Sequence, residues 1–136
     1  MKTIGIDISK ITFDVFSEEL GHLKFSNDKG GFKSFKQLLN KDDHCVMEAT
    51  GCYHIQFANY LYEGGFKVSV ENPLVIKRFI QMKKQKVKTD KHDAYMIAKY
   101  GEEQNPKLWE PEPAFIEEGK LITTLIQMYV KTADTA

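Results

Sequence analysis

An aspartate interrupts the first apolar segment of the chain, at Asp7. Its neighbours Ile4, Ile6 and Ile8 occupy every second position, which is the period of a β-strand with one apolar face. Asp7 therefore belongs to the opposite face of a strand that is tied into the core. A carboxylate in such a place is costly unless it is paired, protonated or bound to a metal ion. We expect this strand to carry a functional acid.

Three further acids stand at the ends of regular segments. Glu48 ends the apolar run of residues 44–47, and Asp90 and Asp93 lie three positions apart at the start of a helical pattern. Helical residues at this spacing share a face, and neighbouring parallel strands end at one edge of a sheet. Four oxygen donors gathered there could hold two Mg²⁺ or Mn²⁺ ions about 4 Å apart. We predict a catalytic, metal-binding site made of Asp7, Glu48, Asp90 and Asp93.

These acids also have simpler interpretations. Asp90 and Asp93 could be first-turn acids that the helix dipole favours, with Thr89 as the N-cap. Glu48 could be a surface acid at the end of a strand. A zinc site is disfavoured, because the spacing of the nearby histidines and cysteines in residues 44–54 fits no standard zinc site.

Basic residues gather immediately before the acidic pair. From Lys77 to Lys91 there are seven lysines or arginines, opposed only by Asp90. Lysines can hold a phosphate backbone without reading its sequence. A solvated loop is the simpler alternative. We predict contacts to nucleic acid from five lysines: Lys83, Lys84, Lys86, Lys88 and Lys91.

The order of the expected elements predicts an α/β domain with a mixed sheet. Residues 2–9, 11–19 and 22–26 predict a three-strand antiparallel meander. Residues 45–48 and 66–70 predict two parallel strands, because helices separate them. Helices are expected at about 32–39, 53–63, 73–82, 90–100 and 114–130. Residues 83–88 lack a clean period and predict a loop.

Length and composition set the outer limits. The 136 residues carry no net charge and suit one compact domain, which we place at residues 1–104. Prolines in residues 105–113 predict an extended linker, and residues 114–136 predict the start of a helical region whose apolar stripe packs on a partner chain. No apolar run approaches the roughly 20 residues that span a bilayer. The two cysteines are too few for a disulfide scaffold, so we expect a cytoplasmic protein.

Three sequence motifs, taken together, resemble a known family of transposases. The motifs are Gly5-Ile6-Asp7-Ile8-Ser9-Lys10, Met47-Glu48-Ala49-Thr50-Gly51 and Lys88-Thr89-Asp90-Lys91-His92-Asp93-Ala94. In this order and at these separations they are similar to the DEDD transposases of the insertion-sequence one-ten group, which are related to the Piv DNA invertases. The resemblance covers about residues 1–113, and Asn72-Pro73 before the basic stretch also fits.

The resemblance implies an RNase H-like fold close to that of the RuvC junction resolvases. It implies that Asp7, Glu48, Asp90 and Asp93 are a metal-binding, catalytic tetrad, and that the last helix begins a coiled-coil dimerisation region. The family moves DNA by strand exchange at short matching core sequences. In characterised members a structured noncoding RNA guides the choice of target and donor. We therefore expect a metal-dependent DNA transposase or recombinase that is guided by RNA in its full-length form.

One part of the family pattern has no counterpart in this sequence. Family members continue into a second domain that supplies a serine nucleophile, and no serine here matches that motif. We therefore expect a domain or a truncated product that cannot complete recombination. Three alternatives stay open: a stand-alone RuvC-like Holliday junction nuclease, a catalytically silent module that binds nucleic acid or dimerises, and a fragment of an actin-like sugar kinase.

Overall fold

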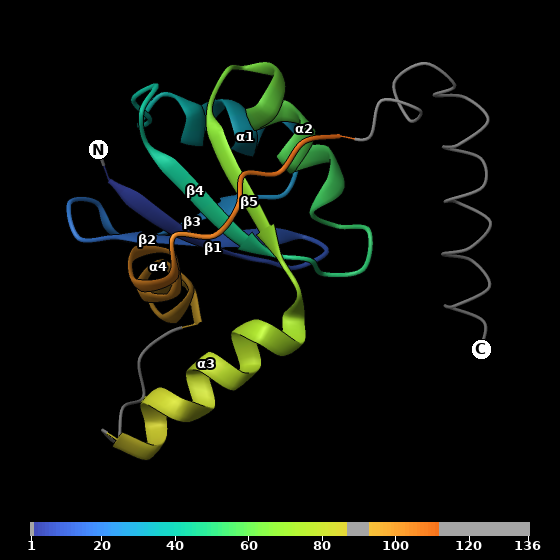
Figure 1. Cartoon of the computed structure of the whole chain (residues 1–136). Coiled ribbons are helices and arrows are strands. Elements are labelled where there is room, and N and C mark those ends of the chain that lie inside the picture. The colour runs from blue at the N-terminus through green and yellow to red at the C-terminus, as the bar shows by residue number, and fades with distance from the viewer. Residues whose placement is uncertain (1, 87–92, 112–136) are drawn as a thin grey trace, which may run out of the picture.

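The computed structural model describes residues 2–86 and 93–111, with side chains for residues 2–83 and 93–111. Within these residues, five strands form one mixed sheet and four helices lie on its two faces (Figure 1). This arrangement confirms the predicted RNase H-like α/β class. No helix in the described ranges is both long and apolar enough to cross a membrane.

The sheet has the predicted meander and the predicted parallel strands. The strands are β1 (Thr3–Ile8), β2 (Thr12–Ser17), β3 (Gly21–Ser26), β4 (His44–Glu48) and β5 (Lys67–Glu71). They lie in the order β3-β2-β1-β4-β5, so the first strand of the chain is the central one. β1 pairs with β2 in the antiparallel sense and with β4 in the parallel sense. The carboxyl ends of β1 and β4 therefore meet at one edge of the sheet.

The helices are α1 (Lys29–Lys36), α2 (Ile55–Glu63), α3 (Pro73–Lys86) and α4 (Asp93–Gln104). Asp28 caps α1, because its carboxylate accepts a hydrogen bond from the Gly31 backbone N–H at 2.9 Å. A loop was expected at residues 83–88, but residues 83–86 are the last part of α3, so this expectation was wrong for them. Lysine and glutamine are good helix formers, so this stretch extends the helix without an apolar stripe of its own.

An aromatic cluster fills the face of the sheet that α1 and α2 cover. Its rings belong to Phe13, Phe25, Phe32, Phe35 and Phe57. The ring centroids of Phe13 and Phe57 lie 4.3 Å apart, and both side chains are fully buried. Burial of such side chains is the main favourable term in folding. This half of the core packs against one face of β1 and β2, and the polar residues of these strands lie on the other face.

α4 lies very close to β1 on that other face. A Cβ atom built on Gly5 would come 2.1 Å from the Ala94 carbonyl oxygen and 2.3 Å from the Ala98 backbone nitrogen. Only a residue without a side chain allows the two backbones to approach this closely. Because Gly5 lies two positions before Asp7 and Ala94 follows Asp93, this approach also brings the start of α4 toward the acidic end of β1.

Residues 105–111 run in an extended form beside β5 (Figure 1). The Trp109 backbone N–H donates to the Val68 carbonyl oxygen at 2.7 Å, and the Ser69 hydroxyl donates to the Lys107 carbonyl oxygen at 2.9 Å. These bonds cover part of the free edge of the sheet. The expected linker of residues 105–113 is thus docked over its described part, and the helical region expected at 114–136 lies outside the described residues.

Candidate active site

Acidic residues form a row across the face of the sheet that α4 covers. Asp7 on β1 is paired with Asp14 on β2, and Glu48 on β4 is paired with Glu71 on β5. The last paired residues of β1 and β4 are Ile6 and Met47, so the next residues, Asp7 and Glu48, lie side by side. Side chains on neighbouring strands at one level point to the same face. The row therefore crosses four adjacent strands.

The charges of three predicted site residues act on one another. Burial is the largest cause that raises the pKa of Glu48, and the negative charges of Asp7 and Asp93 raise it further. Asp93 contributes because it is the first residue of α4, where the helix begins beside the sheet edge. Carboxylates that repel one another in this way favour either a bound proton or a bound cation.

The donor chemistry of these three residues fits a hard divalent cation. Asp7, Glu48 and Asp93 offer only carboxylate oxygens, the ligands that Mg²⁺ and Mn²⁺ prefer. Among the described residues, no three acidic, histidine or cysteine side chains are close enough to form a finished ion site. Asp90, the fourth predicted ligand, lies outside the described residues. The tetrad therefore stays a prediction, although the structure brings three of its members into one electrostatic group.

Sequence reasoning missed two further residues of the site region, Glu71 and Tyr100. The Tyr100 hydroxyl donates to Glu71 Oε2 at 2.6 Å, and the Asn72 backbone N–H donates to Glu71 Oε1 at 2.8 Å. Burial, followed by the bond to Glu71 and its charge, raises the pKa of Tyr100 to about 12. Tyr100 is two helical turns beyond Asp93, so this spacing on one helix face was the available signal. The bond ties α4 to β5 next to Glu48.

Asp14 was also missed, and its charge is balanced from β3. Its Oδ1 atom lies 3.3 Å from His22 Nε2 and 3.8 Å from Lys24 Nζ. The same oxygen is buried and has no partner with hydrogen-bond geometry. Strict alternation along residues 12–17 could have placed Asp14 on the acidic face. The nearby Lys24 ammonium group makes Asp14 a weaker candidate for a metal ligand than Asp7.

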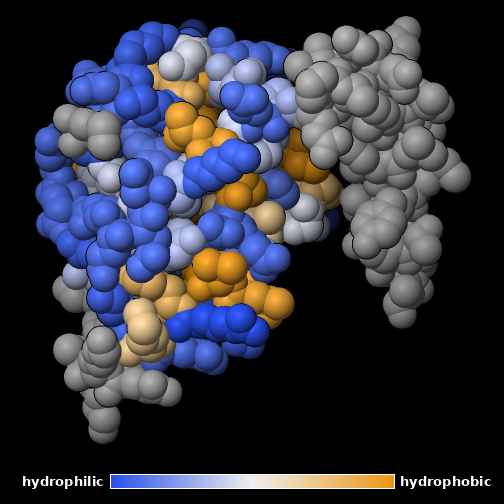
Figure 2. Space-filling model, viewed as in Figure 1, coloured by the Kyte–Doolittle hydropathy of each residue, from blue (hydrophilic) through white to orange (hydrophobic). Residues whose placement is uncertain are grey.

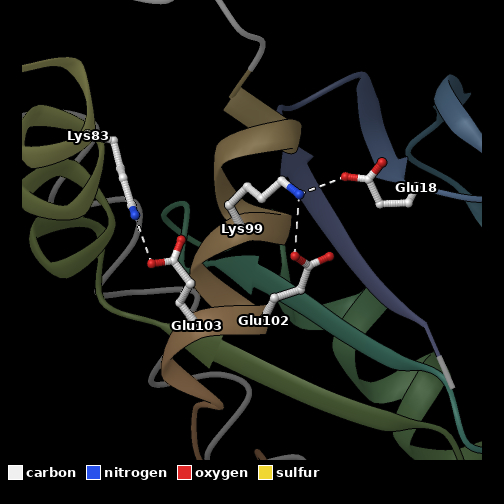
Figure 3. A network of polar contacts seen from close by, with 5 residues as sticks. All are labelled: Glu18, Lys83, Lys99, Glu102 and Glu103. Carbon is white, nitrogen blue, oxygen red and sulfur yellow. Dashed lines mark hydrogen bonds and ion pairs between the residues drawn. The ribbon is translucent and has the colours of Figure 1, made fainter. Parts of the chain in front are cut away.

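Of the five lysines that are predicted to contact nucleic acid, only Lys83 has a described side chain. Lys83 Nζ lies 2.8 Å from Glu103 Oε1, which links α3 to α4 (Figure 3). Beside it, Lys99 bridges Glu18 at 2.7 Å and Glu102 at 3.4 Å. Lys84 and Lys86 belong to α3, but their side chains are not described, and Lys88 and Lys91 lie outside the described residues. Lys83 would have to exchange Glu103 for a phosphate group.

A pocket of about 400 Å³ opens beside the acids. It lies between the end of β4, the start of α4 and the first turns of α3. Its described lining consists of Glu48, Pro73, Leu74, Ile76, Lys77, Ile80, Gln81 and Asp93. A hollow of this size next to grouped carboxylates is a common form of substrate site.

Comparison with known proteins shows what kind of protein carries this arrangement. A family model described as a transposase, of the DEDD type of the insertion-sequence one-ten group, matches residues 4–133. The chain belongs to this transposase family. The family predicted from the three motifs is therefore confirmed, and DNA recombination is the activity of the class to which the chain belongs.

Two relatives of this transposase domain are named pilin gene-inverting proteins. They come from Moraxella bovis and Moraxella lacunata, and each is 35% identical to the chain over 118 residues. The matched region is 80% of this chain but 37% of each relative. The chain thus spans little more than a third of the length of these relatives.

Proposed function

We propose that this chain is the catalytic domain of a DNA transposase or site-specific recombinase that cleaves and exchanges DNA strands with bound Mg²⁺ or Mn²⁺. The observation that supports the proposal is the electrostatic grouping of Asp7, Glu48 and Asp93 at one sheet edge in a chain of this family. The names of the two relatives, which describe inversion of a gene, support strand exchange between DNA sites.

The four acids have distinct roles in this proposal. Asp7 comes from the central strand and Asp93 from the start of α4, and Asp90 is the fourth proposed ligand. Burial and the charges of Asp7 and Asp93 raise the pKa of Glu48, and a bound cation would offset this repulsion by favouring the carboxylate. When bound, two such ions would activate the attacking hydroxyl group and stabilise the oxygen that leaves the phosphodiester.

The remaining features of the proposal concern partners. Lys84, Lys86, Lys88 and Lys91 hold DNA phosphates near the acids, with Lys83 joining when it leaves Glu103. In the full-length protein, a structured RNA guides target choice, the region after residue 113 pairs two copies, and a second domain supplies a serine nucleophile. We place this protein in the cytoplasm.

Substitution of the acids tests the catalytic proposal. Asp7→Asn, Glu48→Gln and Asp93→Asn are expected to reduce Mg²⁺- or Mn²⁺-dependent cleavage of linear DNA to background. Each replacement removes one negative oxygen donor and keeps nearly the same shape. The measurement is product formation on labelled DNA, with thermal unfolding as a check that each variant is folded.

Glu63→Gln is the matched control, since Glu63 is an exposed acid at the end of α2, on the other side of the sheet. It should cleave like the wild type. Metal-dependent cleavage that persists in all three acid variants would overturn the proposal. Resolution of four-way junctions by the 136-residue chain alone would instead favour the stand-alone junction nuclease.

A further inference from the structure

The pocket beside the acids combines two kinds of wall. Leu74, Ile76 and Ile80 make an aliphatic side, and Lys77 and Gln81 add one cationic and one amide group to the described lining. Glu48 and Asp93 close the pocket toward the sheet. Its volume, about 400 Å³, falls within the range of roughly 300–1,000 Å³ that is typical of small-ligand pockets.

The helix that supplies most of this pocket, α3, contains both basic and apolar residues. α3 begins at Pro73, has no acidic residue, and leaves the sheet beside the end of β5 (Figure 1). Leu74 is 60% exposed and Val75 is 39% exposed. Figure 2 shows apolar surface where α3 leaves the sheet, surrounded by hydrophilic groups. Exposed apolar groups rimmed by charge indicate a binding surface.

We propose that this pocket binds a single unpaired nucleotide of the DNA substrate, adjacent to the phosphate that is cleaved. The proposal rests on the proposed function, because it assumes that the acids act on DNA. The aliphatic wall packs against the base and sugar, which are largely apolar on their faces. The Gln81 amide has both a donor and an acceptor for a base edge, and the Lys77 ammonium pairs with the flanking phosphate.

Strand exchange gives a physical reason for such a pocket. Base pairs next to the cut must open before a strand can pair with a new partner. Holding an opened nucleotide offsets part of the cost of unstacking it, and this cost is smallest for a base that is already unpaired. A free phosphate ion is a poorer fit, because Lys77 would be its only cationic partner in the described lining while two carboxylates face it.

The test measures binding, so it is read separately from cleavage. The wild-type chain is titrated, with Ca²⁺ as the divalent ion, against three labelled DNA duplexes. One is fully paired, one contains a single unpaired nucleotide, and one has an abasic residue in place of that nucleotide. We expect the duplex with the unpaired nucleotide to bind about fivefold to tenfold more tightly than the abasic duplex, as for one sheltered base.

Two matched pairs of variants on α3 isolate the pocket. Gln81→Trp fills the pocket and should abolish the preference, whereas Met82→Trp adds the same ring outside it and should retain the preference. Lys77→Gln should weaken binding of the duplex with the unpaired nucleotide more than Arg78→Gln does, although both remove one positive charge from neighbouring exposed positions.

Three outcomes would overturn the inference. They are equal affinity for the nucleotide and abasic duplexes, equal effects within each matched pair, and a Gln81→Trp variant that changes the oligomeric state while keeping the DNA preference. The last result would assign the pocket to a protein partner. A wild-type chain that cleaves DNA without any preference overturns this inference and leaves the proposed function intact, whereas a chain that binds no DNA overturns both.

Discussion

Glu48 combines a structural and a functional demand in one side chain. It ends a strand whose other members are buried, and it lies among acids that disfavour its charge. Its carboxylate is therefore less stable in the folded chain than in an unfolded one, unless a cation is bound. Under the proposed function, the same repulsion would be relieved by a bound cation.

Glu48→Gln is expected to stabilise the metal-free domain at neutral pH. Because the pKa of Glu48 is raised above its ordinary value of 4.5 in the folded state, the folded chain binds more protons than the unfolded chain above that pH, and its stability falls as pH rises. Glutamine removes this loss. The melting temperature of the variant should exceed that of the wild type by a few degrees at pH 7, and the difference should shrink toward pH 4.5.

Addition of Mg²⁺ supplies the control for this prediction. The ion should raise the melting temperature of the wild type more than that of Glu48→Gln, since a ligand that binds only the folded state stabilises it by mass action. Equal melting temperatures of the two proteins at all pH values, with and without Mg²⁺, would show that the charges of Asp7 and Asp93 do not affect the pKa of Glu48.

Sequence reasoning at the residue scale succeeded where spacing alone decides. Alternation along β1 placed Asp7 opposite the core, and the end of an apolar run placed Glu48 beside it. It failed for Glu71 and Tyr100, because their bond joins two elements that are distant in the chain. The position of α4 over the sheet decides which acid at a strand end is hydrogen-bonded by a side chain of this helix. No local sequence pattern encodes that position.

The contact between β1 and α4 determines the position of this helix over the sheet. The two backbones approach at Gly5, with Ala94 and Ala98 opposite. Tyr100 then ties the helix to β5, and Lys83 and Glu103 tie it to α3. The last pair is at the surface and is worth about 0–1 kcal/mol, so packing at Gly5 holds α4 more strongly.

Gly5→Ala is expected to destabilise the domain by about 1–3 kcal/mol or more. The added methyl group would meet backbone atoms of α4, which cannot rotate away, so the helix must move. Urea unfolding measures the loss. Gly30→Ala is the control, because its added Cβ would lie 3.4 Å from the Asp28 Oδ1 atom, an acceptable contact. A Gly5→Ala variant as stable as the wild type would contradict the close approach.

The order and type of the strands were predictable, because hydrophobic periodicity and short turns determine them. Helix ends were less predictable: α3 continues to Lys86 and α4 continues to Gln104, past the expected end near residue 100. Polar helix formers such as those of residues 83–86 carry no periodic signal, so the end of such a helix depends on tertiary contacts.

At the scale of the whole domain, residues 105–111 belong to the folded unit. The Trp109 backbone N–H donates to the Val68 carbonyl oxygen, and the Ser69 hydroxyl donates to the Lys107 carbonyl oxygen. Trp109 also packs against the core with its ring edge-on to Tyr62. Composition alone predicted a linker here, since prolines favour extended chain. The extended conformation was correct, but its docking depends on a free sheet edge that local sequence does not reveal.

Trp109 is the only tryptophan of the chain, so its fluorescence reports on this docked segment. We expect its unfolding transition in urea to coincide with the transition followed by far-ultraviolet circular dichroism, as in a two-state domain. The Ser69→Ala variant removes the hydroxyl that contacts the Pro106 and Lys107 carbonyl oxygens, and it should shift both curves together. A fluorescence change that precedes the loss of secondary structure would show that the segment detaches independently.

The central position of β1 has a consequence for how the protein is made. The strand leaves the ribosome first, yet its neighbour β4 and its covering helix α4 are synthesised much later. Asp7 therefore waits for Glu48 and Asp93 until most of the domain has been translated. Incomplete products that end before α4 therefore lack the assembled carboxylates.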